Sequence, residues 1–214
     1  DITSNKHLKN VAKAGKNKIT KCAFIGDSSL VITDLSLNLI HLSISFGLFG
    51  ANIKESQLTT FNTFPNQLLS PPCYKYVGDS ISTQKVSNQS HCISTSFSQT
   101  VGISLYNKVI IASVSSTNYE VIAEYQAEKP IISLSLPNPD TLYVAFASSN
   151  KITICSINSS NQSEVIHTQS LKSSPQFISF LSSSIIALIY EDFSVSLFSF
   201  LISSEDSAKL ELRG

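Results

Sequence analysis

The side chains that could carry out chemistry are few in this chain, and their spacing is irregular. Its four histidines, His7, His41, His91 and His167, share no spacing typical of metal ligands. The sequence also lacks a Gly-x-Ser-x-Gly nucleophile turn, a glycine-rich phosphate loop and a His-Glu-x-x-His zinc motif. Serine is abundant, but serine without a placed histidine and carboxylate does not indicate a nucleophile. We therefore expect no catalytic residue, no metal site and no cofactor, and we expect that the protein is not an enzyme.

The cysteines also argue against a metal or redox site. Cys22, Cys73, Cys92 and Cys155 form no Cys-x-x-Cys pair. Three of them lie in predicted strands, where a free thiol behaves as a small buried hydrophobic group. This pattern favours a reducing compartment.

Charge gives one local feature in an otherwise balanced chain. Lys plus Arg and Asp plus Glu both number 15, so the whole molecule exerts no strong steering field. The first 21 residues contain one acidic residue, Asp1. They contain six lysines: Lys6, Lys9, Lys13, Lys16, Lys18 and Lys21. Such a segment could bind phosphates, but it has no arginine and no aromatic residue for base stacking. We interpret residues 1–18 as a lysine-rich lead-in or the end of an upstream blade, and we do not expect nucleic-acid binding.

The clearest pattern is a repeat between about Cys92 and Phe200. Three short apolar strands begin at positions 109, 152 and 195, which is a spacing of 43 residues: Val109-Ile110-Ile111, Ile152-Thr153-Ile154 and Val195-Ser196-Leu197. Each follows a polar turn. A period in the low forties with several strands per unit is typical of propeller blades.

Period-2 alternation of apolar and polar residues predicts four units of strands. The expected strands are 19–25, 30–35 and 39–44; 92–97, 101–105 and 109–114; 131–136, 142–147 and 152–157; and 177–181, 185–190 and 195–201. Residues 119–125 and 165–170 are expected to supply remaining blade strands. The predicted fold class is all-β: a partial propeller of antiparallel blades, about four of the blades of a seven-bladed ring. Because the chain begins at Asp1, we expect earlier blades upstream.

The domain organisation follows from these units. Residues 19–46 hold blade strands, 47–90 form a long irregular insertion, 91–203 hold two to three further blades, and 204–214 are a C-terminal tail or the start of the next segment. Pro65, Pro71 and Pro72 interrupt the alternation in the insertion. Loops of this length are usually functional or disordered.

The insertion begins with the best candidate for partner binding. The segment Ser45-Phe46-Gly47-Leu48-Phe49-Gly50 combines two phenylalanines and a leucine with glycines, and Tyr74 and Tyr76 lie further along the insertion. Phe46, Leu48, Phe49, Tyr74 and Tyr76 are therefore the candidate partner-binding residues. Packing of the same side chains over the end of a blade is the alternative, and the sequence leaves both open.

The units resemble WD-type repeats with the family's signature replaced. Ala112-Ser113, Cys155-Ser156 and Phe198-Ser199 stand where that family has Trp-Asp, and the opening Gly-His pair is absent. The resemblance implies blades that are held together by apolar packing alone.

The layout of the chain is also similar to the N-terminal propeller of the large CORVET-type vacuolar protein-sorting subunits. The block from Ile19 to Asp34, with a strand, a Gly-Asp-Ser-Ser turn, a second strand and Asp34, resembles a recurrent block there. The strand 39–44 and the loop Phe46-Gly47-Leu48-Phe49 take the next places, although the basic residue of that loop is lacking. The resemblance implies a cytoplasmic propeller of an endosomal tethering complex, peripheral on endosomal or vacuolar membranes. It also implies other tether subunits and a Rab-type small GTPase as partners.

Two other functions remain open from the sequence. A propeller scaffold in ribosome biogenesis or another nuclear assembly would give the lysine-rich segment a role in binding nucleic acid. A propeller hydrolase would need convergent carboxylates or a metal at the central channel, and the sequence contains no such cluster.

Overall fold

The chain folds into strands, as a computed structural model shows. The structure describes residues 17–25, 29–47, 50–63, 65, 67–69, 100–137, 143–157, 163–182, 184–202 and 208–213. Every regular element in these ranges is a β-strand, so the predicted all-β class is confirmed. The described part of the chain contains no helix able to cross a membrane.

The strands form four antiparallel sheets of four strands, which we call blades A to D. Blade A contains β1 (Ile19–Ile25), β2 (Ser29–Asp34), β3 (Asn38–Gly47) and β4 (Gly50–Thr60). Blade B contains β5 (Gln67–Leu69), β6 (Thr100–Leu105), β7 (Lys108–Val114) and β8 (Tyr119–Gln126). Blade C contains β9 (Ser133–Ser135), β10 (Tyr143–Ser148), β11 (Lys151–Ile157) and β12 (Ser163–Ser170). Blade D contains β13 (Pro175–Ser182), β14 (Ile185–Tyr190), β15 (Val195–Ile202) and β16 (Ala208–Leu212).

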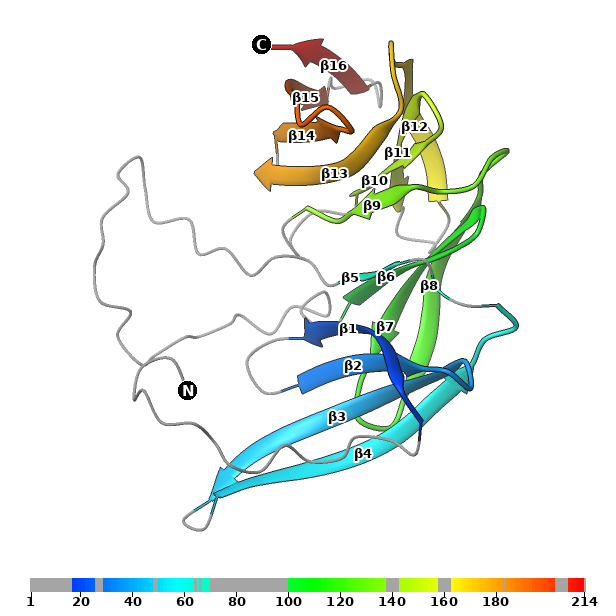
Figure 1. The fold of residues 1–214 in the computed structure, drawn as a ribbon, viewed down its shortest axis with the longest axis vertical. Helices are drawn as coiled ribbons and strands as arrows, with labels where there is room; N and C mark the ends of the chain where they lie inside the picture. Colours follow the sequence, from blue (N-terminus) through cyan, green and yellow to red (C-terminus); the bar gives the residue numbers. More distant parts are fainter. Residues whose placement is uncertain are drawn as a thin grey trace, which may run out of the picture.

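The blades follow one another around an arc, with the first strand of each blade on the inside (Figure 1). Apolar side chains fill each junction between neighbouring blades. Val31 and Leu39 of blade A pack with Val101 and Ile103 of blade B in one such core. Separate buried clusters join blade B to blade C and blade C to blade D. Burial of these faces supplies the main stabilisation, at about 25 cal/mol per Å² of apolar surface.

Serine hydroxyls connect the inner strands of neighbouring blades. The backbone N–H groups of Ile178 and Phe180 in β13 donate to the Oγ atoms of Ser133 and Ser135 in β9, at 3.1 and 2.9 Å. The N–H of Leu134 in β9 donates in turn to Oε1 of Gln67 in β5, at 2.6 Å. An inner strand has a sheet neighbour on one edge only, so these side chains satisfy N–H groups that would otherwise be buried without a partner.

The expected irregular insertion at 47–90 is wrong for the residues that the structure describes. β4 (Gly50–Thr60) is a long strand paired with β3, and β5 (Gln67–Leu69) is the inner strand of blade B. β4 is the outer strand of its sheet, so most of its described side chains are exposed or half-buried and polar residues interrupt the alternation. β5 has three residues, too few to show any period.

Two further predictions about strands are corrected. The place beside β6 that we assigned to residues 92–97 belongs to β5, and residues 92–97 lie outside the described part of the chain. Residues 204–214 are predicted to be a C-terminal tail or the start of the next segment, but Ala208–Leu212 form β16, which pairs with β15 and completes blade D. This strand is also an outer one with exposed polar positions, and it leaves little periodic signal in the sequence.

Removing the Ser135 hydroxyl should destabilise the junction between blades C and D. In Ser135→Ala the buried N–H of Phe180 loses its acceptor, so we expect the free energy of unfolding to fall by about 1–3 kcal/mol. Urea denaturation of the two proteins measures the difference. Ser173→Ala, the same deletion at an exposed serine in the connection that precedes β13, is the control and should change the midpoint little. Equal effects at the two positions would contradict this role of Ser135.

Candidate functional site: the turn face

Each blade makes a tight turn between its second and third strands, and all four turns contain a residue in the left-handed region. These residues are Leu37, Tyr106, Ser149 and Phe193, with φ of 66°, 50°, 53° and 62°. None of them is glycine. For a residue other than glycine the left-handed conformation costs about 1–2 kcal/mol. The same backbone strain therefore recurs once in each blade.

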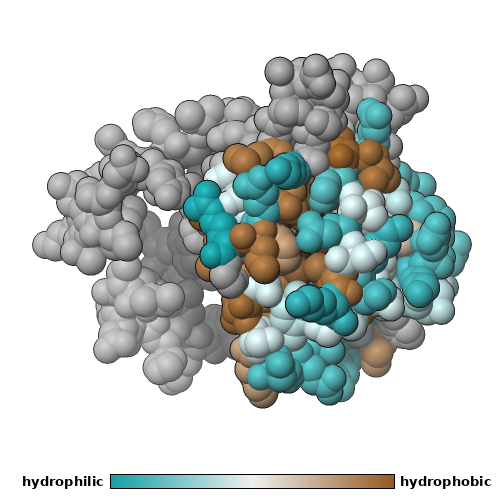
Figure 2. Space-filling view, turned by 90° about the horizontal axis from the view of Figure 1, so that it is seen from above, coloured by the Kyte–Doolittle hydropathy of each residue, from teal (hydrophilic) through white to brown (hydrophobic). Residues whose placement is uncertain are grey.

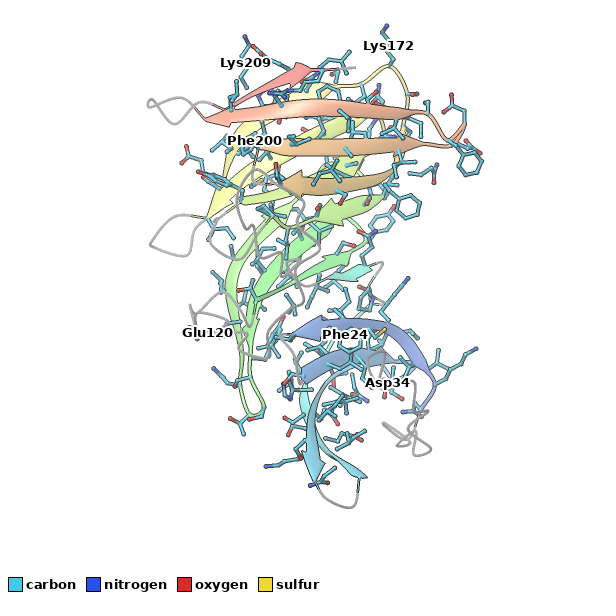
Figure 3. The ribbon with its side chains drawn as sticks, turned by 90° about the vertical axis from the view of Figure 1, so that its left-hand side faces the viewer. Phe24, Asp34, Glu120, Lys172, Phe200 and Lys209 are labelled. Atoms are coloured by element: carbon cyan, nitrogen blue, oxygen red, sulfur yellow. The ribbon has the colours of Figure 1, made fainter. Side chains whose placement is uncertain are left out.

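These four turns emerge on one side of the molecule, which we call the turn face. The connections between blades run over the same side: the N–H of Ile131 donates to the carbonyl oxygen of Tyr106, and that of Leu171 to Asn150, both at 2.7 Å. In Figure 3, Asp34 and Lys172 lie toward the turn face on the right, whereas Glu120, at the start of β8, lies on the opposite side. The inter-blade packing therefore fixes where each turn points.

Two of the left-handed residues are exposed aromatics. Tyr106 is 62% exposed and Phe193 is 87% exposed. An exposed aromatic ring gains little from burial in the folded chain, and the backbone at both positions would be relaxed by glycine. Strain combined with an exposed ring, at equivalent turns of blades B and D, is typical of positions that contact a partner.

Tyr106 stands at the edge of a hollow of about 500 Å³ between blades A and B. Its walls come from the exit of blade A and the turn of blade B: Thr60, Phe61, Asn62, Thr63, Leu105, Tyr106, Asn107, Lys108, Ile110 and Gln126. Phe61 and Ile110 are buried and supply apolar surface, and the amide and hydroxyl groups supply hydrogen-bonding partners. A hollow that combines apolar surface with hydrogen-bonding groups and an exposed aromatic can hold a side chain of another protein.

The charge of this hollow is nearly compensated. Lys108, the cation among its lining residues, forms an ion pair with Glu124 at 2.7 Å between Nζ and Oε2. A smaller hollow of about 130 Å³ occupies the corresponding place between blades B and C, where Glu128 accompanies Lys129 and Lys151. The first hollow therefore offers no unpaired cation to a phosphate, whereas the second carries two lysines against one glutamate.

Asp34 holds the turn of blade A rigidly. Its carboxylate accepts hydrogen bonds from the backbone N–H groups of Ser36 and Asn38, at 2.9 and 3.0 Å, and from the side-chain amides of Asn38 and Asn17. Burial by itself would raise the pKa of Asp34, but these hydrogen bonds favour the ionised form and hold the pKa below its ordinary value. Asp34 is therefore a structural residue of the turn face.

The residues predicted to bind a partner lie away from the turn face or outside the residues that the structure describes. Phe46 is in β3, paired with Ala51 of β4, at the end of the strand distant from the turn face. Residues 44–47 of β3 pair with β4 beyond the last β2 partner, so the hairpin projects past the blade (Figure 1). Leu48, Phe49, Tyr74 and Tyr76 lie outside the described residues. Partner binding by these five residues stays a prediction.

Sequence reasoning missed Tyr106 and Phe193, although the signal was present. The 43-residue repeat located the polar turns before each apolar strand. Tyr106 and Ser149 lie three residues before their strands, and Phe193 lies two residues before its own. Comparing the turns instead of the strands would have singled out the two aromatics. Their backbone strain could not be read from the sequence.

The remaining reactive side chains are dispersed. Among the described residues, no three His, Cys, Asp or Glu side chains come together to hold a metal ion. Cys155 is buried between blades, and burial raises the pKa of its thiol to about 12, so the thiol remains protonated and unreactive. His41 is also buried, and desolvation lowers its pKa.

Comparison with known proteins shows the fold alone. No protein-family model matches the chain, and no curated protein matches it. Among solved structures, the chain is similar to Hsv2p of Kluyveromyces lactis, with 11% identity and a TM-score of 0.62 over 90% of this chain. The match spans 59% of the Hsv2p chain, which is a seven-bladed β-propeller. The four blades are thus part of a propeller, as the sequence predicted.

Replacing Asp34 by alanine should make the protein less stable in a pH-dependent way. Asp34→Ala leaves N–H groups of the turn without their acceptor, and we expect a loss of about 1–3 kcal/mol at pH 7. Because the pKa of Asp34 is lowered in the folded chain, its contribution is complete above its ordinary pKa and disappears as the pH falls through the folded value. Urea denaturation at pH 7 and in acid should show the gap between the two proteins narrowing in acid. The exposed Asp192 provides the control, since Asp192→Ala should change stability much less.

The strain at Phe193 should be measurable with a pair of substitutions. Phe193→Gly and Phe193→Ala both remove the ring, but only glycine tolerates a φ of 62° without strain. We expect the glycine variant to be more stable than the alanine variant by about 1 kcal/mol in thermal or urea unfolding. At Val195, in the strand that follows, the order should reverse because glycine weakens a strand. A more stable alanine variant at 193 would mean that the turn is unstrained.

Proposed function

We propose that this chain is a protein-interaction scaffold that binds its partner on the turn face. The observation that carries the proposal is the pair of exposed aromatics, Tyr106 and Phe193, at strained and equivalent turns of blades B and D. A rigid blade presents each ring at little entropic cost on binding, and rigid aromatic anchors dominate many interfaces. A propeller is in general a binding platform, which agrees with this assignment.

A protein partner fits this surface better than a nucleic acid does. The lysine in the hollow beside Tyr106 is paired with Glu124, and the hollow combines buried apolar side chains with amides. Such a site suits an apolar side chain and the peptide groups on either side of it. Four of the lysines of the 1–18 segment lie outside the described residues, and on the turn face Lys108 is paired with Glu124 and Lys129 is accompanied by Glu128.

We further propose that the partner belongs to an endosomal tethering complex. This finer assignment rests on the resemblance of residues 19–34 and 39–44 to the propeller of the large vacuolar protein-sorting subunits. In that setting the turn face would contact another tether subunit or a Rab-type small GTPase at a membrane surface. A scaffold in ribosome assembly is the alternative, and it predicts a different set of partners.

Affinity capture with matched variants tests the proposal. The tagged chain should recover other vacuolar-sorting subunits and a Rab-type GTPase, identified by mass spectrometry. Tyr106→Ala and Phe193→Ala should each reduce this recovery by about 10-fold or more, as expected for hot-spot residues. Phe24→Ala removes an aromatic ring that is 66% exposed in β1, away from the turns, and should leave recovery unchanged.

Each alternative result has its own meaning. Recovery of ribosome-assembly factors would overturn the tether assignment while leaving a scaffold. Loss of binding in Phe46→Ala, with Tyr106→Ala unaffected, would place the contact on the β3–β4 hairpin. Far-UV circular dichroism and thermal unfolding of all the variants separate loss of binding from loss of the fold.

A further inference from the structure

Blade D has one packed face and one open face. The packed face carries Ile178, Phe180, Leu188 and Phe198 against blade C. The registers of β13, β14 and β15 put Phe177, Ile189 and Val195 opposite one another on the other side of the sheet. No described strand covers that side. Seen from above, where blade D lies, hydrophobic side chains reach the surface among polar ones (Figure 2).

The repeated apolar strand shows that the open face has the residues of a contact between blades. The first and third residues of the repeat are buried against the next blade: Val109 and Ile111 against blade C, and Ile152 and Ile154 against blade D. Val195 and Leu197 hold the same two places in blade D. Yet Val195 is 52% exposed and Leu197 is only half-buried. Blade D therefore has the apolar residues of a blade-to-blade interface, but no described blade packs against them.

The inner strands repeat the same relation in hydrogen bonds. Gln67 of β5 accepts from Leu134 of β9, and Ser135 of β9 accepts from Phe180 of β13. Ser135 lies opposite Ala145, and Ser179 lies opposite Ala187, so Ser179 is the next acceptor in the series. Its hydroxyl is exposed on the open side of blade D and accepts from no described strand. An inner strand with free N–H groups would complete the pattern.

We infer that the open face of blade D is a docking surface for a fifth four-stranded blade, supplied by the same polypeptide after Leu212. Each described outer strand leads into the next inner strand over a short connection, from Thr60 to Gln67, from Gln126 to Ser133 and from Ser170 to Pro175. β16 is an outer strand, and it ends at Leu212 with the N–H of Arg213 bonded to Leu197 of the neighbouring strand. A blade that follows directly would reach the open face at a high effective concentration.

The curvature of the arc favours a blade of this chain over a second copy. The arrangement of the four blades follows that of a seven-bladed ring over 90% of the chain, which leaves room for three blades, seven minus four. A second copy would bring four. Two identical open faces packed on each other would also fail to give Ser179 an inner strand that continues the series.

Cysteine reactivity in the protein purified from its own cells tests this inference. Val195→Cys probes the open face, Ser194→Cys probes the adjacent exposed turn, and the native Cys155 is the buried reference. Maleimide labelling is read peptide by peptide by mass spectrometry. If a fifth blade covers the face, the cysteine at 195 should react at least about 100-fold more slowly than that at 194, because labelling then requires local opening. Peptide mapping of the same digest should also show that the polypeptide continues past Gly214 for the length of a blade, because blades before Asp1 would raise the mass as well.

Two results would overturn the inference. Reaction at 195 as fast as at 194 would show that the face is open to solvent in the native protein. Protection at 195 in a polypeptide without a blade after Leu212 would show that a blade upstream of Asp1, a separate protein or a second copy covers the face. Val195 is half exposed in this chain, so the substitution removes little packing, and equal thermal unfolding of the two variants verifies that the fold is intact. Neither result bears on partner binding at Tyr106.

Discussion

The inner edge of the arc is the constraint on which the rest of the structure depends. Each blade begins with a strand that has a sheet neighbour on one side only, so its other edge presents backbone N–H groups inside the molecule. Gln67, Ser133 and Ser135 supply the missing acceptors from the preceding blade. A side chain that bonds to the next strand fixes the distance and register between two blades.

The positions of the turns on the turn face depend on these contacts between the inner strands. Once the inner strands are set, the apolar cores between blades settle the outer strands, and each turn emerges at a fixed place. The hollow beside Tyr106 exists because the exit of blade A and the turn of blade B meet there. A surface that is made from two blades changes only when their packing changes. Binding at this surface is thus coupled to the rigidity of the junction between the blades.

The sequence predicted the strands that are buried on both faces and also the outer strands β8 and β12, but it missed the outer strands β4 and β16. Residues such as Ile152 and Ile154 repeat because two neighbouring blades enclose them, and their period located blades B, C and D. β4 and β16 are outer strands with polar exposed positions, so no alternation marked them. The turn-face residues were not predicted for a different reason. Exposure and backbone strain at Tyr106 and Phe193 are properties of the folded turn, and only the spacing of the turns is encoded visibly.

The short inner strand of blade B has a consequence for how the protein folds. β5 pairs with β6, but residues 70–99 separate the two strands in sequence, whereas β13 and β14 are joined by a tight turn. Closing such a long segment costs conformational entropy, and only three pairs of residues between β5 and β6 offset that cost. Blades C and D consist of local hairpins and can form first. Blade B then completes its sheet when β5 joins β6, and the backbone N–H of Leu134 in the already formed β9 donates to the side chain of Gln67 in β5. Blade C thus serves as the template on which blade B is completed.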